Sequence, residues 1–261
     1  ASMDGYIEIT HPGQLATLLS ETDAEAFVAT GKKVRLMKDL YFNNIAITPN
    51  PSLLYFSDFV FDGNGHTLYN ITVQREGNKA VALFPEVNNV TIKNLVIKDI
   101  NVDAGVGDEA YAGALIGTSY GNVVVEKVKV KNSTIKGTNK VGGLIGFVAQ
   151  DSITLTDCGV SGSTIETNEL ANESGLAGGL IGYIASAEDS VDKCTIESCT
   201  VKNSNLTVIN SLNSADRANS EFIGAVGGNE GDELIIKKCT VENNVFKQTG
   251  VDKNYVAYHE L

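Results

Sequence analysis

Three acidic segments of the chain hold the residues whose types best suit the binding of a ligand. The segments are 103–112, 166–177 and 207–221, and their candidate binding residues are Asp103, Asp108, Glu109, Tyr111, Glu169, Glu173, Asp216 and Arg217. Concentrated negative charge suits a cationic partner or a Ca²⁺ ion, which accepts irregular cages of oxygen ligands. Tyr111 adds a flat surface of the kind that sugars and peptides pack against. We therefore expect a binding surface, with calcium as a candidate ion and no metal ligands assigned; the alternative is that these segments are solvated loops without a ligand.

The sequence supports a catalytic function much less than it supports binding. A polysaccharide lyase needs clustered positive charge and a base, and a glycosidase needs two carboxylates at a defined separation. The chain has three arginines, Arg35, Arg75 and Arg217, and no two of them fall on one strand face of the repeat described below. Asp62 and His66 could form an acid–base pair, but they flank a two-glycine turn, and turn chemistry explains both. No nucleophile elbow, phosphate loop or His-Glu-x-x-His motif is present, so the sequence names no catalytic residue and favours a protein that is not an enzyme.

The three acidic segments interrupt a repeat that accounts for most of the chain. Its copies begin at Val90, Val123, Ile153, Cys194 and Leu234. Each copy has apolar residues two, five, seven and twelve positions further on, with polar residues between them. Steps of two are the side-chain period of a strand, and the step of three marks a corner between two short strands. Copies that advance by roughly 30–40 residues are typical of a solenoid. The pattern predicts a parallel β-helix in which the acidic segments leave one corner and gather on one side.

Two further columns of the repeat have structural interpretations. Nine residues after each start stand residues that tolerate a left-handed corner: Asp99, Asn132, Gly162, Asn203 and Asn243. The cysteines fall in apolar columns, Cys158, Cys199 and Cys239 in one and Cys194 in another. Free cysteine behaves as a small buried hydrophobe. We therefore expect thiols stacked in the core rather than a disulfide or a metal site.

Each copy also carries a run of small residues, and this run resembles a known family. Gly143 to Gly146 and Gly179 to Gly182 both read Gly-Leu-Ile-Gly, and the segment 61–68 is similar to the lead-in coil of proteins with the GLUG motif. The resemblance covers roughly residues 30 to 250 and implies a right-handed β-helix from a secreted or surface-attached protein of Bacteroides-type bacteria. Such coils also occur in larger proteins such as IgA-peptidase-like chains. The motif implies the coil and says little about activity, and no peptidase motif accompanies it.

The ends of the chain depart from the repeat. Residues 1–30 are expected to form a strand at 6–9 and a capping helix that starts at Thr10 as N-cap, with a second helical piece at 23–28. A solenoid needs such a cap because its end would otherwise expose an apolar surface. Residues 31–261 are expected to form the β-helix as one structural domain, irregular over 41–58 and ending in an edge strand at 255–258.

Composition narrows the class of partner. The 261 residues include 32 acidic and 20 basic side chains, for a net charge of −12. This charge argues against nucleic acid or an anionic membrane as partner. No apolar run is long enough to span a bilayer, and no signal peptide or anchor segment is expected within the chain. The sequence thus predicts an all-β, right-handed parallel β-helix that acts, as a monomer, in binding or adhesion to a glycan or protein of a host or matrix surface. The alternatives are a carbohydrate-active enzyme and a structural spacer in a larger surface protein.

Overall fold

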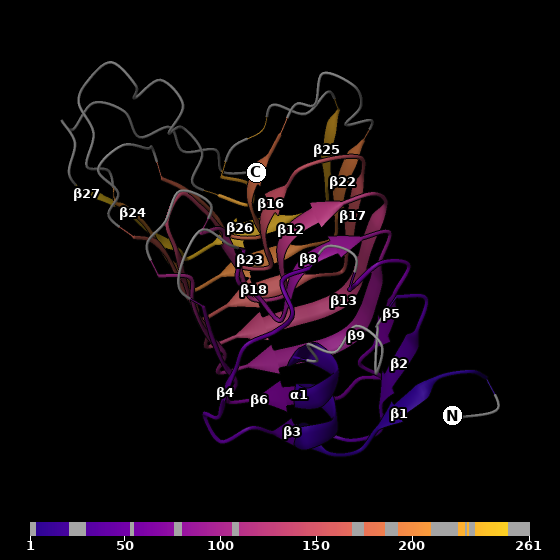
Figure 1. Ribbon diagram of the computed structural model, residues 1–261. Helices are drawn as coiled ribbons and strands as arrows, with labels where there is room; N and C mark the ends of the chain where they lie inside the picture. The colour runs from indigo at the N-terminus through magenta and orange to yellow at the C-terminus, as the bar shows by residue number, and fades with distance from the viewer. Residues whose placement is uncertain are drawn as a thin grey trace.

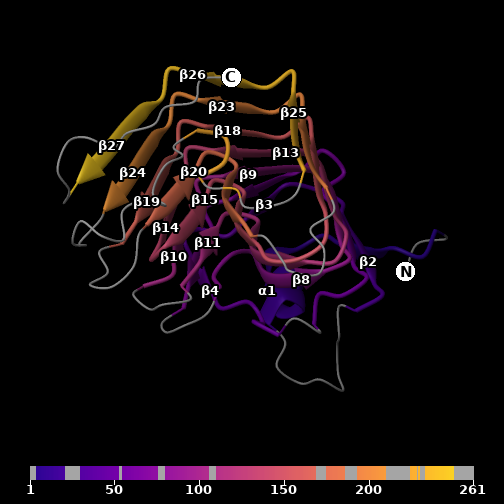
Figure 2. The same ribbon diagram turned by 90° about the horizontal axis from the view of Figure 1, so that it is seen from above.

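The computed structural model of this chain is a right-handed parallel β-helix with a short helix at its N-terminal end (Figures 1 and 2). Seen from above in Figure 2, the chain runs counter-clockwise through β25, β26 and β27 while it rises towards the viewer. The structure describes residues 4–20, 30–52, 55–75, 80–105, 110–168, 175–185, 193–209, 224–227, 229 and 233–249.

Four parallel sheets form the sides of the β-helix. Sheet A, the largest, contains β1 (Ile7–Ile9), β2 (Lys33–Leu36), β3 (Leu40–Tyr41), β5 (Val60–Asp62), β6 (Thr67–Tyr69), β9 (Thr91–Lys98), β13 (Val123–Lys131), β17 (Ile153–Thr156), β18 (Gly159–Ser161), β22 (Cys194–Glu197), β23 (Thr200–Lys202), β25 (Leu234–Lys237) and β26 (Thr240–Glu242). Sheet B contains β4 (Ala46–Ile47), β7 (Thr72–Gln74), β10 (Asn101–Asp103), β14 (Thr134–Gly137), β19 (Thr164–Thr167), β24 (Asn205–Ile209) and β27 (Val245–Thr249).

The other two sheets complete each coil after sheet B. Sheet D contains β11 (Ala112–Gly113), β15 (Lys140–Gly142) and β20 (Leu176–Gly178). Sheet C contains β8 (Phe84–Asn88), β12 (Ile116–Tyr120), β16 (Ile145–Val148) and β21 (Ile181–Ile184). The chain passes from sheet A through B, D and C and back to A, so that each coil lies on the one before it.

The strand register confirms the predicted apolar columns. Ile153 pairs with Val123 in the coil below and with Cys194 in the coil above. Every column member in the four copies that begin at residues 90, 123, 153 and 194 is buried, and the members in the last copy are half-buried. Val160 is buried and Thr156 points outwards, as the period of two requires. Stacked apolar columns therefore form the core.

Left-handed residues make two corners in each coil. The predicted corner is confirmed, since Asp99, Asn132, Gly162, Asn203 and Asn243 have φ between 49° and 59°. A second corner, four residues after each start, divides sheet A where the step of three predicts a corner, but its left-handed conformation was not predicted. Its residues have φ between 53° and 57°, and they are Asn94, Lys127, Asp157, Ser198 and Lys238. A residue such as Lys127 costs about 1–2 kcal/mol in this conformation, so the stacking of the coils must impose it.

Buried serines bind one coil to the next beside the predicted corner. The Ser133 Oγ accepts a hydrogen bond from the Ile100 backbone N–H at 3.2 Å, and the Ser163 Oγ accepts one from the Ser133 N–H at 3.1 Å. The Ser204 Oγ accepts the Ser163 N–H at 3.2 Å. Each hydroxyl also donates to the carbonyl two residues earlier in its own coil. The serines thus replace the strand hydrogen bonds that a corner would otherwise lose.

The segment 142–146, which contains the first Gly-Leu-Ile-Gly run, makes a sharp bend between sheets D and C. A Cβ atom on Gly142 would overlap the carbonyl oxygen of Ile145, and one on Gly146 would lie 2.8 Å from the carbonyl oxygen of Gly117. The first contact lies within one bend and the second lies between coils. Both positions therefore need glycine, because the backbone approaches too closely for any side chain.

The helix α1 (Pro12–Ser20) caps the N-terminal end of the core, as expected. It buries Leu15, Leu18 and Leu19 against the first coils, and the Tyr55 hydroxyl donates to the Leu18 carbonyl at 2.7 Å. The predicted N-cap, Thr10, is wrong by one residue. The His11 Nδ1 accepts the Gly13 N–H at 3.0 Å, and the Gln14 Oε1 accepts the backbone N–H of His11. This reciprocal arrangement makes His11 the N-cap.

Other expectations for the terminal regions have mixed outcomes. The expected N-terminal strand, β1, pairs with β2 and so continues sheet A. The segment 41–58, expected to be irregular, holds the end of β3 and all of β4. The expected helical piece at 23–28 and the expected strand at 255–258 lie outside the described residues.

All four cysteines are free. Cys158, Cys194 and Cys199 are buried, as expected for core thiols, whereas Cys239 in the last described coil is only half-buried. Burial raises the pKa of the Cys194 thiol. A hydrogen bond with Cys158, together with burial, raises the pKa of Cys199. Both effects reduce the fraction of reactive thiolate at neutral pH.

The serine ladder predicts a stability difference between two neighbouring serines. Ser163→Ala removes the acceptor of the buried Ser133 N–H and should lower the free energy of unfolding by about 1–3 kcal/mol. Ser161→Ala, on the outer face, should change it by less than about 0.5 kcal/mol. Denaturant unfolding followed by circular dichroism compares them, and equal free energies for the two variants would contradict the ladder.

The cysteines predict an order of chemical labelling. In the native protein a thiol reagent should modify Cys239 first and leave Cys158, Cys194 and Cys199 unmodified, because these three thiols are buried and the reagent cannot reach their sulfur atoms. In denaturant all four should react. Mass spectrometry of labelled peptides measures the order. Early labelling of Cys194 would show that its apolar column is accessible to solvent, which contradicts the prediction.

Candidate functional site: the loop edge

The loops leave the β-helix along the border between sheets B and D, which we call the loop edge. The strands β10, β14, β19 and β24 stack in register, and the chain leaves sheet B at the ends of β10, β19 and β24. The stacked ends confirm the predicted common corner. After β14 the link to β15 is short, as expected. Figure 2 shows sheets B and D side by side along this edge.

Two of the eight predicted binding residues lie within the described part of the chain. They are Asp103, the last residue of β10, and Tyr111, just before β11. The other six lie outside the described residues: Asp108, Glu109, Glu169, Glu173, Asp216 and Arg217. Calcium binding by these loops therefore stays a prediction.

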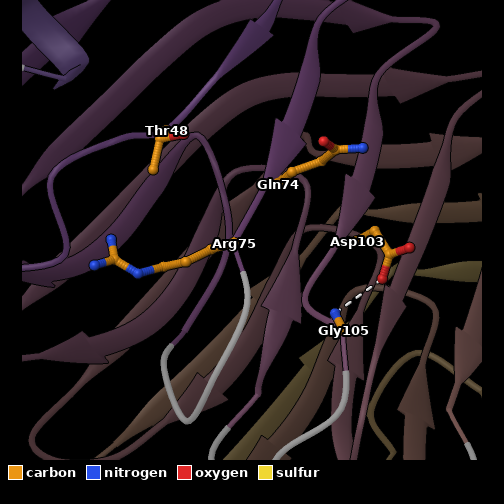
Figure 3. Close-up of a pocket in the computed structure, with 5 residues that line it drawn as sticks. All are labelled: Thr48, Gln74, Arg75, Asp103 and Gly105. Atoms are coloured by element: carbon orange, nitrogen blue, oxygen red, sulfur yellow. Dashed lines mark hydrogen bonds between the residues drawn. The ribbon is translucent and has the colours of Figure 1, made fainter.

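An open polar concavity of about 550 Å³ lies at the N-terminal part of the loop edge. Thr48, Gln74, Arg75, Asp103 and Gly105 line it (Figure 3). Asp103 pairs in register with Gln74, and the Asp103 Oδ1 accepts the Gly105 N–H at 2.9 Å. In Figure 3 the Arg75 side chain extends towards the side of Thr48, whereas Gln74 and Asp103 lie on the other side. Guanidinium, amide, carboxylate and hydroxyl groups together supply the donors and acceptors that a hydroxyl-rich ligand needs.

Sequence reasoning missed Gln74 and Arg75 because their coil is out of phase with the others. Asp62 pairs with Lys93, 31 residues on, but Thr67 pairs with Val96, only 29 residues on. The turn between Asp62 and Thr67 therefore contains two extra residues, which shift every later column of this coil. Allowing for this shift would have placed Gln74 at the position of Asp103.

Tyr111 belongs to a half-buried aromatic row on the other side of the loop edge. Its ring meets Phe147 at 5.0 Å in an edge-to-face arrangement, and Phe147 stacks on Tyr183 at 5.9 Å. The Lys140 Nζ lies 4.5 Å from the Tyr111 ring centroid and 4.3 Å from that of Phe147. Cation–π attraction thus fixes the start of sheet D beside the loops. Tyr111 therefore packs within a row rather than standing as an isolated flat surface.

Polar contacts between coils hold the described loop ends in place. The Asn168 Nδ2 donates to the Gly105 carbonyl at 2.5 Å, two coils away, and the Thr167 Oγ1 accepts the Ile209 N–H at 2.8 Å. Lys136 and Glu166 form an ion pair at 3.2 Å on the outer face of sheet B. These contacts connect neighbouring coils at the base of the loop edge.

The structure supports the turn interpretation of Asp62 and His66. Asp62 is buried and accepts hydrogen bonds from the Asn64 N–H at 2.8 Å and the Asn94 Nδ2 at 3.1 Å. The His66 Nδ1 instead lies 3.3 Å from Asp39 Oδ1. The two residues therefore have separate partners and do not form an acid–base pair.

Comparisons with known proteins agree with the fold. The structure is similar to that of a candidate immunoglobulin A1 protease from Bacteroides ovatus, with a TM-score of 0.63 and 14% identity over 99% of this chain and 84% of that chain. At this identity the similarity shows the fold alone. In sequence, 93 residues, or 35% of this chain, are 32% identical to halomucin of Haloquadratum walsbyi, and the match spans 1% of halomucin. The sequence matches no established family profile, so the resemblance to GLUG-motif proteins stays a prediction.

No helix within the described ranges has both the length and the apolar character needed to cross a membrane.

Proposed function

We propose that this β-helix is a non-catalytic module of a secreted or cell-surface protein that binds a glycan or protein partner through its loop edge. The observation that carries the proposal is the polar concavity at that edge, where Gln74, Arg75 and Asp103 present hydrogen-bonding groups from adjacent stacked coils. The local similarity to halomucin and the fold shared with the Bacteroides ovatus chain support a surface or secreted setting.

Arg75 is the strongest recognition group of this concavity. Its Nη1 donates to the Pro49 carbonyl at 3.4 Å, and within the described residues it forms no ion pair. The planar guanidinium therefore keeps donors for a ligand acceptor. Asp103, one coil further along, offers the complementary acceptor. A ligand with both hydroxyl donors and acceptors, such as a sugar, matches this pair.

A carbohydrate-active enzyme is the alternative, and the concavity offers little for it. Glycoside hydrolysis normally uses two carboxylates that flank the scissile bond. Among the described lining residues Asp103 is the one carboxylate. Binding without turnover is therefore the function that these residues support best, and a purely structural spacer would need no such concavity.

The proposal predicts that substitutions at the concavity weaken ligand binding and leave the fold intact. On an array of neutral glycans, and on a panel of matrix proteins, the Gln74→Ala/Arg75→Ala variant should bind about tenfold more weakly than the parent. The control Thr195→Ala/Lys237→Ala lies on the outer face of sheet A, away from the loop edge, and should bind like the parent.

Three results would overturn the proposal. Retention of no glycan and no protein by the parent would favour the spacer, and full binding by the Gln74→Ala/Arg75→Ala variant would place the site elsewhere. Release of shorter sugars from a bound glycan would instead favour the enzyme. Melting temperatures of all variants check that the coils stay folded.

A further inference from the structure

Tyrosine and lysine side chains, with one serine among them, form a row on the outer face of sheet A, away from the loop edge. The row follows the strand register from Tyr41 through Tyr69, Lys98, Lys131 and Ser161 to Lys202. We call it the tyrosine–lysine stripe. Its strands β3, β6, β9, β13, β18 and β23 stack one above another in Figure 1. With about 4.8 Å between paired strands, the stripe is roughly 24 Å long and parallel to the axis of the β-helix.

The N-terminal end of the stripe is an aromatic platform. The rings of Tyr41 and Tyr69 stack at 4.5 Å with an angle of 1° between their planes. Tyr41 is 54% exposed and lies outside the core, so its ring is open to a ligand. The Lys98 Nζ lies 5.9 Å from the Tyr69 ring and so joins the platform to the basic part of the stripe.

The rest of the stripe offers about one positive charge per coil. Lys98 and Lys131 lie on adjacent strands, and Lys202 lies two coils further on. In the coil between Lys131 and Lys202 the stripe has Ser161. The Lys129 side chain, from the coil below, lies across Gly159, which belongs to the same coil as Ser161, and so places its Nζ beside that coil. Lys129 thereby supplies a positive charge on that coil, two residues to the side of Ser161.

Most of these lysines have no acidic partner. Within the described part of the chain, Lys98, Lys129 and Lys131 form no ion pair, whereas Lys202 pairs with Glu242 at 2.7 Å. The carboxylates of Asp99 and Asp157 stand at the neighbouring corners without reaching these amino groups. In a chain with a net charge of −12, unpaired lysines gathered on one stripe need an explanation.

We propose that the tyrosine–lysine stripe binds a linear acidic polysaccharide with one carboxylate per sugar, laid along the axis of the β-helix. Each sugar of such a polymer is about as long as one step between coils, so its carboxylates meet successive lysines. The sugar rings at one end pack on Tyr41 and Tyr69. The site goes beyond the loop edge and depends on different residues from a different sheet.

Charge density separates this ligand from nucleic acid. Duplex DNA carries one negative charge per about 1.7 Å of its axis, which is far denser than one lysine per about 4.8 Å. The acidic remainder of the surface would also repel a wide polyanion. A thin polymer with sparse charge fits within the stripe and avoids that repulsion.

An oligogalacturonate and its fully methyl-esterified, uncharged form are the matched probes. The parent protein should bind the acidic oligomer in calorimetry and the ester at least about tenfold more weakly, because only the former carries carboxylates. Raising the salt from about 50 mM to about 300 mM should weaken the acidic complex, since exposed charges are screened.

Matched variants test the residues. Lys98→Gln/Lys129→Gln/Lys131→Gln should lose about tenfold in affinity for the acidic oligomer. The control Lys32→Gln/Lys33→Gln/Lys247→Gln removes the same charge elsewhere and should bind like the parent. Tyr41→Ala should lower the affinity and leave its salt dependence unchanged.

The loop-edge variant Gln74→Ala/Arg75→Ala separates the two proposals, since it should keep full affinity for the acidic oligomer. Equal losses in the stripe and control variants, or no binding of the acidic oligomer by the parent, would overturn the stripe proposal. Tighter binding of duplex DNA than of oligogalacturonate would overturn it too and make nucleic acid the ligand. Melting temperatures of the stripe and control variants check that neither is unfolded.

Discussion

The stacking of like residues in register from coil to coil is the constraint on which the rest of this structure depends. A single coil cannot bury its own apolar side chains, because it is one strand layer thick and open above and below. Val130, Val160 and Val201 are buried only because each has a residue of the same column on the coil below and on the coil above. The helix α1 supplies that cover at the N-terminal end. The corners then follow, since a left-handed residue or a buried serine must recur wherever the coil turns.

The same stacking turns the outer surface into rows. A residue that points outwards has its neighbours about 4.8 Å away on the coils below and above. The strand register alone therefore brings Tyr41 onto Tyr69 and Lys136 beside Glu166, with which it forms an ion pair. Loops behave in the same way, because insertions after one strand position all leave one edge. A β-helix thus presents linear surfaces that suit linear ligands, whatever the residues along them.

The sequence predicted the structure of those positions that recur at fixed spacing in the repeat, and it failed where a position departs from that spacing or has no residue preference. The inward columns and the Asn-rich corner were predicted because apolar and left-handed residues recur at fixed spacing. The step of three predicted the position of the second corner but not its left-handed conformation, since Lys127 and Ser198 carry no preference for that conformation. Two extra residues in one turn hid the position of Gln74 and Arg75. The lysine row was overlooked because a net charge of −12 describes the whole chain and says nothing about how its cations are distributed.

The loop edge and the stripe lie on the same coils and so share a backbone, but they bind their ligands through different outward side chains. Asp103 follows Lys98 by one corner, and that corner is held by the hydrogen bond from Ile100 N–H to Ser133 Oγ. A change in a buried column would shift a coil and so disturb both surfaces together. A change of an outward side chain leaves the columns in place, and effects at sites without shared partners usually add. Loss of binding at one surface alone therefore indicates lost contacts, whereas loss at both indicates a displaced coil.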